Sequence, residues 1–265
     1  MTATPQSGAV TPTLIRNLHD SFRPISLAEL NERAELLERR DSKYVLDHQA
    51  FLAFMAHAST HFDILEIDGL RQFRYRTVYF DSPEFHCYQD HNKGRRRRIK
   101  VRLRQYRDHG LQFFEVKFKG RRNTTHKVRT PLTAQEFEAS QLPDRLLAFC
   151  NETLQLHYGR HWPHALTRGM VVDYNRTTLV ARHGDERITI DNDLRFIDGE
   201  RSISMNPQRW IVEVKSRTGV SSIDRWLYRN KHRPVPRCSK YCMGVSLLQF
   251  PEKVDQFTPV IRRHF

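Results

Sequence analysis

The sequence is poor in several kinds of residue, and each shortage excludes a class of protein. Four cysteines in 265 residues are too few for a disulfide scaffold. No run approaches the roughly 18 apolar residues of a membrane-spanning helix, and residues 1–10 lack the basic and apolar regions of a signal peptide. Glycine is also scarce, with 11 residues, which excludes a collagen-like chain. We therefore expect a cytoplasmic protein without a membrane anchor of its own.

The motifs of several enzyme classes are missing as well. No Gly-x-Ser-x-Gly elbow, P-loop or Gly-x-Gly-x-x-Gly occurs, which argues against acyl-transfer and hydride-transfer enzymes. Cys238 and Cys242 have no second Cys or His pair at zinc-site spacing. His157, His161 and His164 lack a fourth ligand, so surface histidines are the simpler interpretation.

Positive charge is what the sequence has in excess. Lys and Arg total 44 against 30 Asp and Glu, for a formal net charge of +14. The segment from Arg71 to Thr130 alone carries a net charge of +13, from 18 basic and 5 acidic residues. Since unpaired like charges repel, we expect an anionic partner: nucleic acid, an anionic membrane surface or a polyphosphate-type ligand. The membrane surface is the weakest of these, because the basic run falls on predicted strands rather than on an amphipathic helix.

Hydrophobic periodicity predicts the secondary structure. Helices are expected over residues 26–40, 47–58, 133–157 with a break at Pro143, 223–230 and 241–249. Strands are expected over residues 43–46, 74–81, 98–106, 111–119, 126–130, 170–176, 187–191 and 209–215. Residues 91–94 are expected to form a turn or loop. We predict a flexible N-terminal tail over residues 1–24 and a single domain over residues 25–265.

The predicted strands carry charged side chains on their polar faces. Arg98, Lys100, Arg102 and Arg104, for example, alternate with Ile99 and other apolar residues. For any one strand the simplest interpretation is a half-solvated sheet. A whole sheet this basic on one face would repel itself unless it surrounded an anion. We therefore predict an α+β fold, an antiparallel eight-stranded-type β tunnel barrel with a charged bore, flanked by helices.

Two glutamates stand in near-identical contexts on these strands. Glu115 lies in Phe-Glu-Val-Lys and Glu213 in Val-Glu-Val-Lys. Each is either a salt-bridge partner for neighbouring cations or a ligand of Mg²⁺ or Mn²⁺, since hard cations take carboxylates together with substrate phosphates. The residues alone leave both interpretations open.

Short segments of a known family occur here in order. They are Arg39-x-Asp41-x-Lys43-Tyr44, residues 77–83 with Tyr88, Lys100-Val-Arg102-Leu-Arg104-x-Tyr106, Phe114-Glu115-Val116-Lys117, His126-Lys127, Tyr174-x-Arg176, Arg187-x-Thr189-x-Asp191, Val212-Glu213-Val214-Lys215 and residues 234–241. In this order and spacing they resemble the polyphosphate polymerase domain of vacuolar transporter chaperone (VTC) proteins, in the CYTH or triphosphate-tunnel superfamily.

The resemblance implies an enzyme that transfers the γ-phosphate of ATP to a growing polyphosphate chain, with Mn²⁺ or Mg²⁺ as cofactor. The implied catalytic residues are Lys43, Arg102, Arg104, Lys117, Lys127, Arg176, Arg187 and Lys240. The implied substrate-binding residues are Lys100, Arg129, Tyr174, Lys215, Arg237 and Ser239. Glu213 is the implied metal ligand, with Glu115 as a second candidate. Where the family has Lys, this chain has Arg237. The arginine keeps the positive charge and has a guanidinium that can bind in a bidentate way.

One departure separates this chain from hydrolytic and cyclase members of the superfamily. Those members carry Glu-x-Glu-x-Lys where this sequence reads Arg39-x-Asp41-x-Lys43, which favours a polymer-holding site. Two alternatives stay open. One is an inorganic triphosphatase or polyphosphatase on the same fold. The other is a non-enzymatic binder of polyphosphate or RNA. The sequence predicts no specific nucleic-acid site and names no protein partner.

Overall fold

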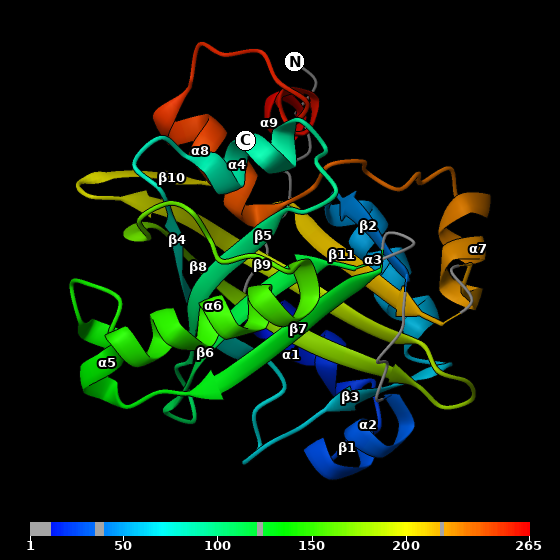
Figure 1. Cartoon of the computed structure of the whole chain (residues 1–265). Coiled ribbons are helices and arrows are strands. Elements are labelled where there is room, and N and C mark those ends of the chain that lie inside the picture. Colours follow the sequence, from blue (N-terminus) through cyan, green and yellow to red (C-terminus); the bar gives the residue numbers. More distant parts are fainter. Residues whose placement is uncertain (1–11, 35–39, 121–123, 218–219) are drawn as a thin grey trace.

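The computed structural model describes residues 12–34, 40–120, 124–217 and 220–265 (Figure 1). Its helices are α1 (Pro12–Asp20), α2 (Leu27–Ala34), α3 (His48–Ala58), α4 (His86–Asn92), α5 (Ala134–Glu138), α6 (Asp144–Tyr158), α7 (Ser222–Arg229), α8 (Lys240–Gln249) and α9 (Thr258–His264). Its strands are β1 (Pro24–Ile25), β2 (Arg40–Leu46), β3 (Phe62–Leu65), β4 (Phe73–Asp81), β5 (Ile99–Tyr106), β6 (Leu111–Lys119), β7 (Thr125–Pro131), β8 (Thr167–Ala181), β9 (Arg187–Asp198), β10 (Arg201–Ser204) and β11 (Trp210–Ser216).

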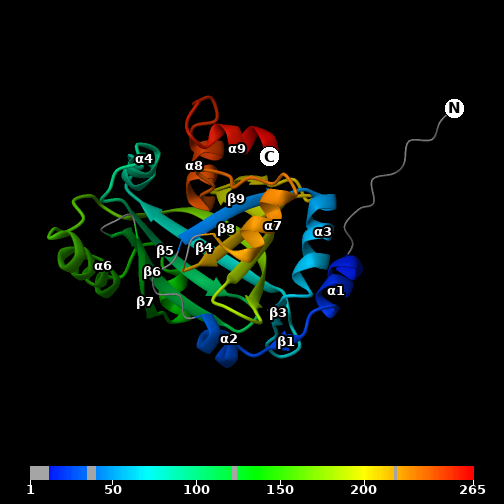
Figure 2. The same cartoon turned by 90° about the vertical axis from the view of Figure 1, so that its right-hand side faces the viewer.

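One large sheet organises the molecule, and the helices flank it (Figures 1 and 2). Its main path runs β2-β11-β9-β8-β4-β5-β6-β7, and β10 pairs with β9 while β3 pairs with β8. Every pairing along this path is antiparallel. Only the short β1 runs parallel to its partner, β3. The predicted α+β class with a large antiparallel sheet is therefore confirmed.

The prediction of a closed barrel is wrong. Within the described residues, the end strands β2 and β7 do not pair with each other, so the sheet is curled but open. The chain segment 234–239 lies along β2 instead, where the Val235 amide donates a hydrogen bond of 2.6 Å to the Lys43 carbonyl. A backbone acceptor of β2 is thus satisfied by a loop rather than by a closing strand.

Apolar side chains on the outer face of the sheet pack beneath the helices. One cluster joins β4, β5 and β6 to α6 and α8, through residues such as Val101, Phe114 and Leu146. A second cluster packs α3 and α7 against β2, β9 and β11, with Phe51 stacked on Trp210. Because side chains alternate along a strand, the residues between these apolar positions face the interior of the curl.

Residues 12–24 do not form the predicted flexible tail. Helix α1 and strand β1 lie within this range, Phe22 is buried at 3% exposure, and His19 contacts the Thr177 hydroxyl at 3.1 Å. Apolar residues of this segment pack on the sheet, and the Thr, Pro and Ser content concealed that pattern. Residues 1–11 lie outside the described residues, and the single domain over 25–265 stays a prediction.

The predicted turn at residues 91–94 is half right: α4 extends to Asn92, and Lys93 and Gly94 form the turn. The carboxylate of Asp81 accepts hydrogen bonds from the backbone amides of Cys87 and Tyr88 at 2.7 and 2.9 Å. A carboxylate at this place stabilises the first turn of the helix. Gly94, with φ of +66°, then provides the left-handed conformation in which the chain leaves the helix.

Candidate functional site

Strand alternation brings the predicted strand residues to one surface, which we call the inner face. The pairing register places them beside one another across the main path of the sheet: Asp41 and Lys43 on β2, Glu213 and Lys215 on β11, Arg187, Thr189 and Asp191 on β9, Tyr174 and Arg176 on β8, Tyr75, Thr77 and Tyr79 on β4, Lys100, Arg102 and Arg104 on β5, Glu115 and Lys117 on β6, and Lys127 and Arg129 on β7. Basic side chains outnumber carboxylates on this surface. The site is therefore suited to an anion with several charges.

Glu115 is the buried centre of one half of the inner face. Its side chain is 0% exposed, and its carboxylate lies 2.6 Å from Arg102 Nη2 and 3.2 Å from Lys127 Nζ. Arg104 lies farther away, at 3.9 Å. Burial by itself raises the pKa of Glu115, but these three cations outweigh burial and hold the pKa well below its usual range. Glu115 therefore stays ionised and fixes the orientation of the cations around it.

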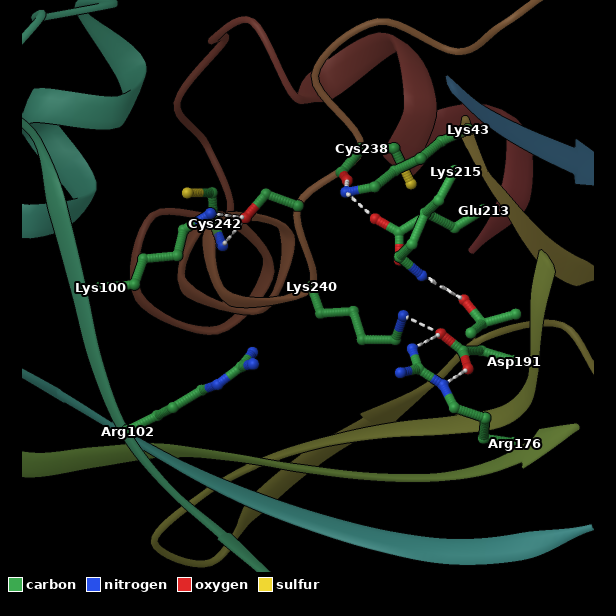
Figure 3. A network of polar contacts seen from close by, with 12 residues as sticks. Lys43, Lys100, Arg102, Arg176, Asp191, Glu213, Lys215, Cys238, Lys240 and Cys242 are labelled. Carbon is green, nitrogen blue, oxygen red and sulfur yellow. Dashed lines mark hydrogen bonds and ion pairs between the residues drawn. The ribbon is translucent and has the colours of Figure 1, made fainter. Parts of the chain in front are cut away.

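Glu213 occupies the corresponding place in the other half. Its carboxylate lies 2.9 Å from Lys215 Nζ and 3.6 Å from Lys43 Nζ, and the Thr189 hydroxyl donates to it at 3.4 Å (Figure 3). Burial opposes ionisation, but Lys215 and Lys43 hold the pKa of Glu213 well below its usual range. Unlike Glu115, its side chain is 14% exposed. This carboxylate is the more accessible of the two.

Helix α8 covers one end of the inner face with its N-terminus. Lys240, its first residue, pairs with Asp191, and Arg176 also binds Asp191 through two hydrogen bonds of 2.6 and 2.7 Å (Figure 3). Ser239 caps the helix by accepting from the Cys242 amide at 3.3 Å. Lys100 donates to the same Ser239 hydroxyl at 2.9 Å. Strand and helix residues that are distant in sequence thus meet at one place.

Several polar groups of the inner face retain unused hydrogen-bonding capacity. Arg104 Nε and Thr77 Oγ1 are buried and have no hydrogen-bond partner among the residues that the structure describes. These two residues are paired across β4 and β5, while Arg104 Nη2 donates to the Tyr174 hydroxyl at 3.1 Å. Buried polar groups without partners are costly. The Arg104 guanidinium therefore has one N–H group that the described residues do not use.

Three lysines of the inner face are easier to deprotonate than usual. Burial lowers the pKa of Lys117 to about 7, and it lowers that of Lys100 and that of Lys215 to about 8. Neighbouring cations add to the effect at all three, and Lys43 acts on both Lys100 and Lys117. An anion bound among them reverses this repulsion, because it favours the charged ammonium form.

The interior opens to the outside through a cavity of about 440 Å³ between β2, β5, β6 and the segment 234–239. We call it the opening. Its basic lining residues are Lys43, Arg98, Lys100, Lys117, Lys119 and Arg237, and Asp41 is the carboxylate among its lining residues. Arg237 has a left-handed backbone, with φ of +61°. The predicted substrate-binding residues Arg237 and Ser239 are therefore at this entrance rather than deep in the interior.

The fit to a divalent cation is different for the two glutamates. The described part of the chain contains no group of three or more His, Cys, Asp or Glu residues that could hold a metal ion. Mg²⁺ is, however, commonly bound by one or two carboxylates together with substrate phosphates. Glu213 suits this mode, because its side chain is 14% exposed and its ion pairs with Lys215 and Lys43 are longer, at 2.9 and 3.6 Å. Glu115 suits it less, because none of its side chain is exposed and its ion pairs with Arg102 and Lys127 are shorter, at 2.6 and 3.2 Å.

Some predicted residues lie at the margin of the site or outside the description. Arg129 is exposed on β7, opposite Glu115 in the pairing register, and its guanidinium lies 4.6 Å from the centre of the Phe113 ring. Arg39 lies outside the described residues, so its departure from Glu-x-Glu-x-Lys stays a sequence observation. The prediction of functional side chains did not include Tyr75 and Thr77. The available signal was that Tyr75 and Thr77 stand four and two residues before Tyr79 on β4 and so share its face.

The comparisons with known proteins agree with this geometry. The family model of the VTC domain matches residues 38–249. The chain belongs to the VTC domain family. The matched range contains every inner-face residue named above and the N-terminus of α8. A search of the curated proteins found no match. Among the described residues, no helix is long and apolar enough to cross a membrane.

Similar solved structures are remote. A Vibrio parahaemolyticus protein described as a candidate adenylate cyclase is 15% identical, with 73% of this chain and 83% of that chain covered and a TM-score of 0.38. A Pyrococcus horikoshii protein is 13% identical, with 80% and 98% covered and a TM-score of 0.45. A Hippeastrum protein, described as a candidate adenylyl cyclase with a dominant triphosphatase activity, is 13% identical, with 79% and 95% covered and a TM-score of 0.46. Such values support no inference about the activity of this chain.

Proposed function

We propose that this VTC domain transfers the γ-phosphate of ATP to a growing inorganic polyphosphate chain on its inner face. The observation that carries the proposal is the charge pattern of that face. Cations from strands on both sides of the curl and from α8 converge on one interior, and each of the carboxylates Glu115, Asp191 and Glu213 is bound by at least two of them. The remaining positive charge is available to a polyanion.

The arginines are prepared for phosphate binding before the substrate arrives. Arg102 is held by Glu115 and contacts the Tyr79 hydroxyl at 3.3 Å. Arg176 is held by Asp191, and its guanidinium lies 5.3 Å from the centre of the Tyr174 ring. Cations that are already oriented stabilise charge on a transferring phosphoryl group without further reorganisation. We assign Arg102, Arg104 and Arg176 to this role.

The lysines contribute mobile charge, and Glu213 is the residue that would hold the divalent cation. When bound, Mn²⁺ or Mg²⁺ neutralises charge on the triphosphate oxygens. Lys43 and Lys215 flank Glu213, so both place positive charge beside the carboxylate where phosphate would meet the cation. Lys240, at the start of α8, pairs with Asp191 and adds a positive charge there. This places charge around the triphosphate from several directions.

The reaction does not require a protein nucleophile. The inner-face residues assigned above contain no Cys or His. The terminal phosphate of a polyphosphate chain is already anionic, so it can attack the γ-phosphorus directly once the two are aligned. The bond between the γ-phosphorus and the bridging oxygen of ADP then breaks, and ADP leaves. The protein needs only to align the groups and to neutralise their charge.

The decisive experiment incubates the purified chain with ATP and Mn²⁺ and measures polyphosphate, ADP and free phosphate in parallel. Polymer that accumulates in step with ADP supports the proposal. Free phosphate without polymer assigns the site to a triphosphatase or polyphosphatase, in which water replaces the chain end. If no product forms while polyphosphate or RNA still binds, the site is a binding module and the assignment of catalysis is overturned.

A further inference from the structure

Three exposed arginines lie within two residues of Arg98, which lines the opening, or of Tyr158. Arg96 and Arg97 belong to the loop between α4 and β5, and Arg160 follows the C-terminal end of α6. All three are exposed, and in the described ranges none of them forms an ion pair with a carboxylate. We call these three residues the outer arginine patch. The reactions on the inner face do not use them.

Tyr158 connects the outer arginine patch to the opening. Its hydroxyl contacts the carbonyl of Lys119 at 2.8 Å and that of Arg98 at 3.2 Å, and both of these residues line the opening. Burial raises the pKa of the Tyr158 hydroxyl, whereas the Lys119 backbone and the charges of Arg98, Arg160 and Arg97 oppose that rise. The charges of Arg97, Arg98 and Arg160 therefore act on one hydroxyl that is bonded to two residues of the opening.

The same loop also lies beside the segment on the other side of the opening. A side chain added at Gly94 would place its Cβ 3.7 Å from Arg237 Nη2. Arg95 is partly neutralised by Asp90 at 3.2 Å, and this leaves the charge of Arg96 and Arg97 without a local partner. Positive charge thus continues from the lining of the opening onto the outer surface. A polyanion bound along this surface relieves the repulsion among these groups.

We propose that the outer arginine patch binds the part of a long polyphosphate chain that has left the inner face through the opening. This inference rests on the proposed function, and it adds a second contact region for the product. A chain that is charged along its whole length reaches both the interior and the patch, whereas a triphosphate in the interior does not. The aromatic lining residues Phe118 and Phe257 are buried. Among the described lining residues neither phenylalanine ring is exposed for base stacking, so polyphosphate fits better than RNA.

The test compares a short and a long ligand on the full chain. The triple variant Arg96→Ala, Arg97→Ala, Arg160→Ala is titrated with tripolyphosphate and with premade long-chain polyphosphate. We expect roughly tenfold weaker binding of the long chain, since three exposed charge contacts of modest strength are lost, and unchanged binding of tripolyphosphate. The salt dependence of long-chain binding should also become less steep, by roughly 2 in the slope of log K against log salt for three released counterions.

A matched variant controls for the loss of charge alone. Arg107, at the far end of β5 from Arg98, and Arg225 and Arg229 on α7 are exposed and lie outside the lining of the opening. Replacing these three by Ala removes the same charge and should leave both affinities unchanged. Equal weakening by both triple variants, or equal weakening of both ligands, overturns the inference. So does binding of single-stranded RNA to the patch as tight as that of polyphosphate. The binding test requires no turnover of ATP. If the ATP reaction fails, that result counts against the proposed function and not against this inference.

Discussion

At the scale of single residues, the two glutamates have different environments and should respond differently to the same change. Glu115→Gln leaves Arg102 and Lys127 without their buried counter-charge. Removing one member of a buried ion pair costs roughly 3 kcal/mol. We expect a Tm lower by roughly 6–12 °C for a chain of this size, measured by thermal melting followed by circular dichroism.

Glu213→Gln should instead remove activity while the protein stays folded. Glu213 is partly exposed, and Lys43 and Lys215 can lose protons or turn away when the carboxylate charge is absent. We expect turnover of ATP to fall by at least two orders of magnitude, since metal-assisted charge neutralisation is lost. The far-ultraviolet circular dichroism spectrum should match that of the unchanged protein. Full turnover at limiting Mn²⁺ would contradict the metal role of Glu213.

Lys100 gives the site a pH dependence. Burial, together with the charges of Lys43, Arg102 and Arg98, lowers its pKa to about 8, although Cys242 acts in the opposite direction. A bound anion favours the ammonium form, so binding takes up a proton once the free side chain is neutral. Affinity for tripolyphosphate should therefore fall as pH rises above 8, by at most roughly tenfold per unit for one proton.

Two observations separate this effect from general alkaline unfolding. The unfolded chain binds more protons at Lys100 than the folded chain between pH 8 and the ordinary pKa of 10.5, so this residue makes the fold more stable as pH rises. Affinity and stability should then change in opposite directions. Lys100→Arg keeps its charge throughout and should flatten the affinity profile measured by isothermal titration calorimetry. An identical slope in both proteins would contradict the assignment.

At the scale of elements, the alternating strands were predictable and their partners were not. The period of two on β5 and β6 fixes which side chains share a face, so Arg102, Glu115 and Lys117 could be grouped from the sequence alone. The ion-pair partners of each carboxylate depend on register and on rotamers that no local pattern records. Lys240 illustrates this, because it reaches Asp191 only once α8 is docked.

The docking of α8 depends on a single small residue. A Cβ at Gly244 would lie 2.9 Å from the Phe196 ring and 3.0 Å from Met170 Sδ. Gly244→Ala should therefore displace the helix, together with Ser239 and Lys240 at its N-terminus. Overpacking of this kind costs roughly 1–3 kcal/mol, which the higher helix propensity of Ala offsets by about 1 kcal/mol.

A change in KM would show the displacement of α8 more clearly than a change in Tm does. We expect KM for ATP to rise several-fold in Gly244→Ala, with a modest decrease in Tm. Gln249→Ala at the other end of α8 changes helix propensity without the steric conflict, and it should leave KM unchanged. If Gly244→Ala also leaves KM unchanged, the N-terminus of α8 does not contribute to binding of ATP.

At the scale of the whole molecule, the charge pattern of the sequence predicted a sheet that curls around an anion. It did not show whether the end strands of that sheet pair with each other. Excess charge on one face of a sheet requires an enclosed anion, and that argument led to a closed barrel. The argument does not state which strands meet. Val235 satisfies a backbone group of β2 that a closing strand would otherwise use, and no periodicity in residues 234–239 predicts that contact. The N-terminal helix was missed in the same way, because its burial depends on docking to Thr177.

The same charge excess should make the fold depend on its ligand. Basic side chains on the inner face repel one another without an anion, and a ligand that binds only the folded state stabilises it in proportion to the logarithm of its concentration. At about 100 times Kd the gain is about 2.7 kcal/mol, or a rise in Tm of roughly 5–10 °C. Differential scanning calorimetry in tripolyphosphate, against sodium chloride of equal ionic strength, measures it. Chloride screens charge without bridging several cations at once, so it should give a much smaller rise. Equal shifts in the two salts would mean that the inner face senses ionic strength and holds no polyphosphate.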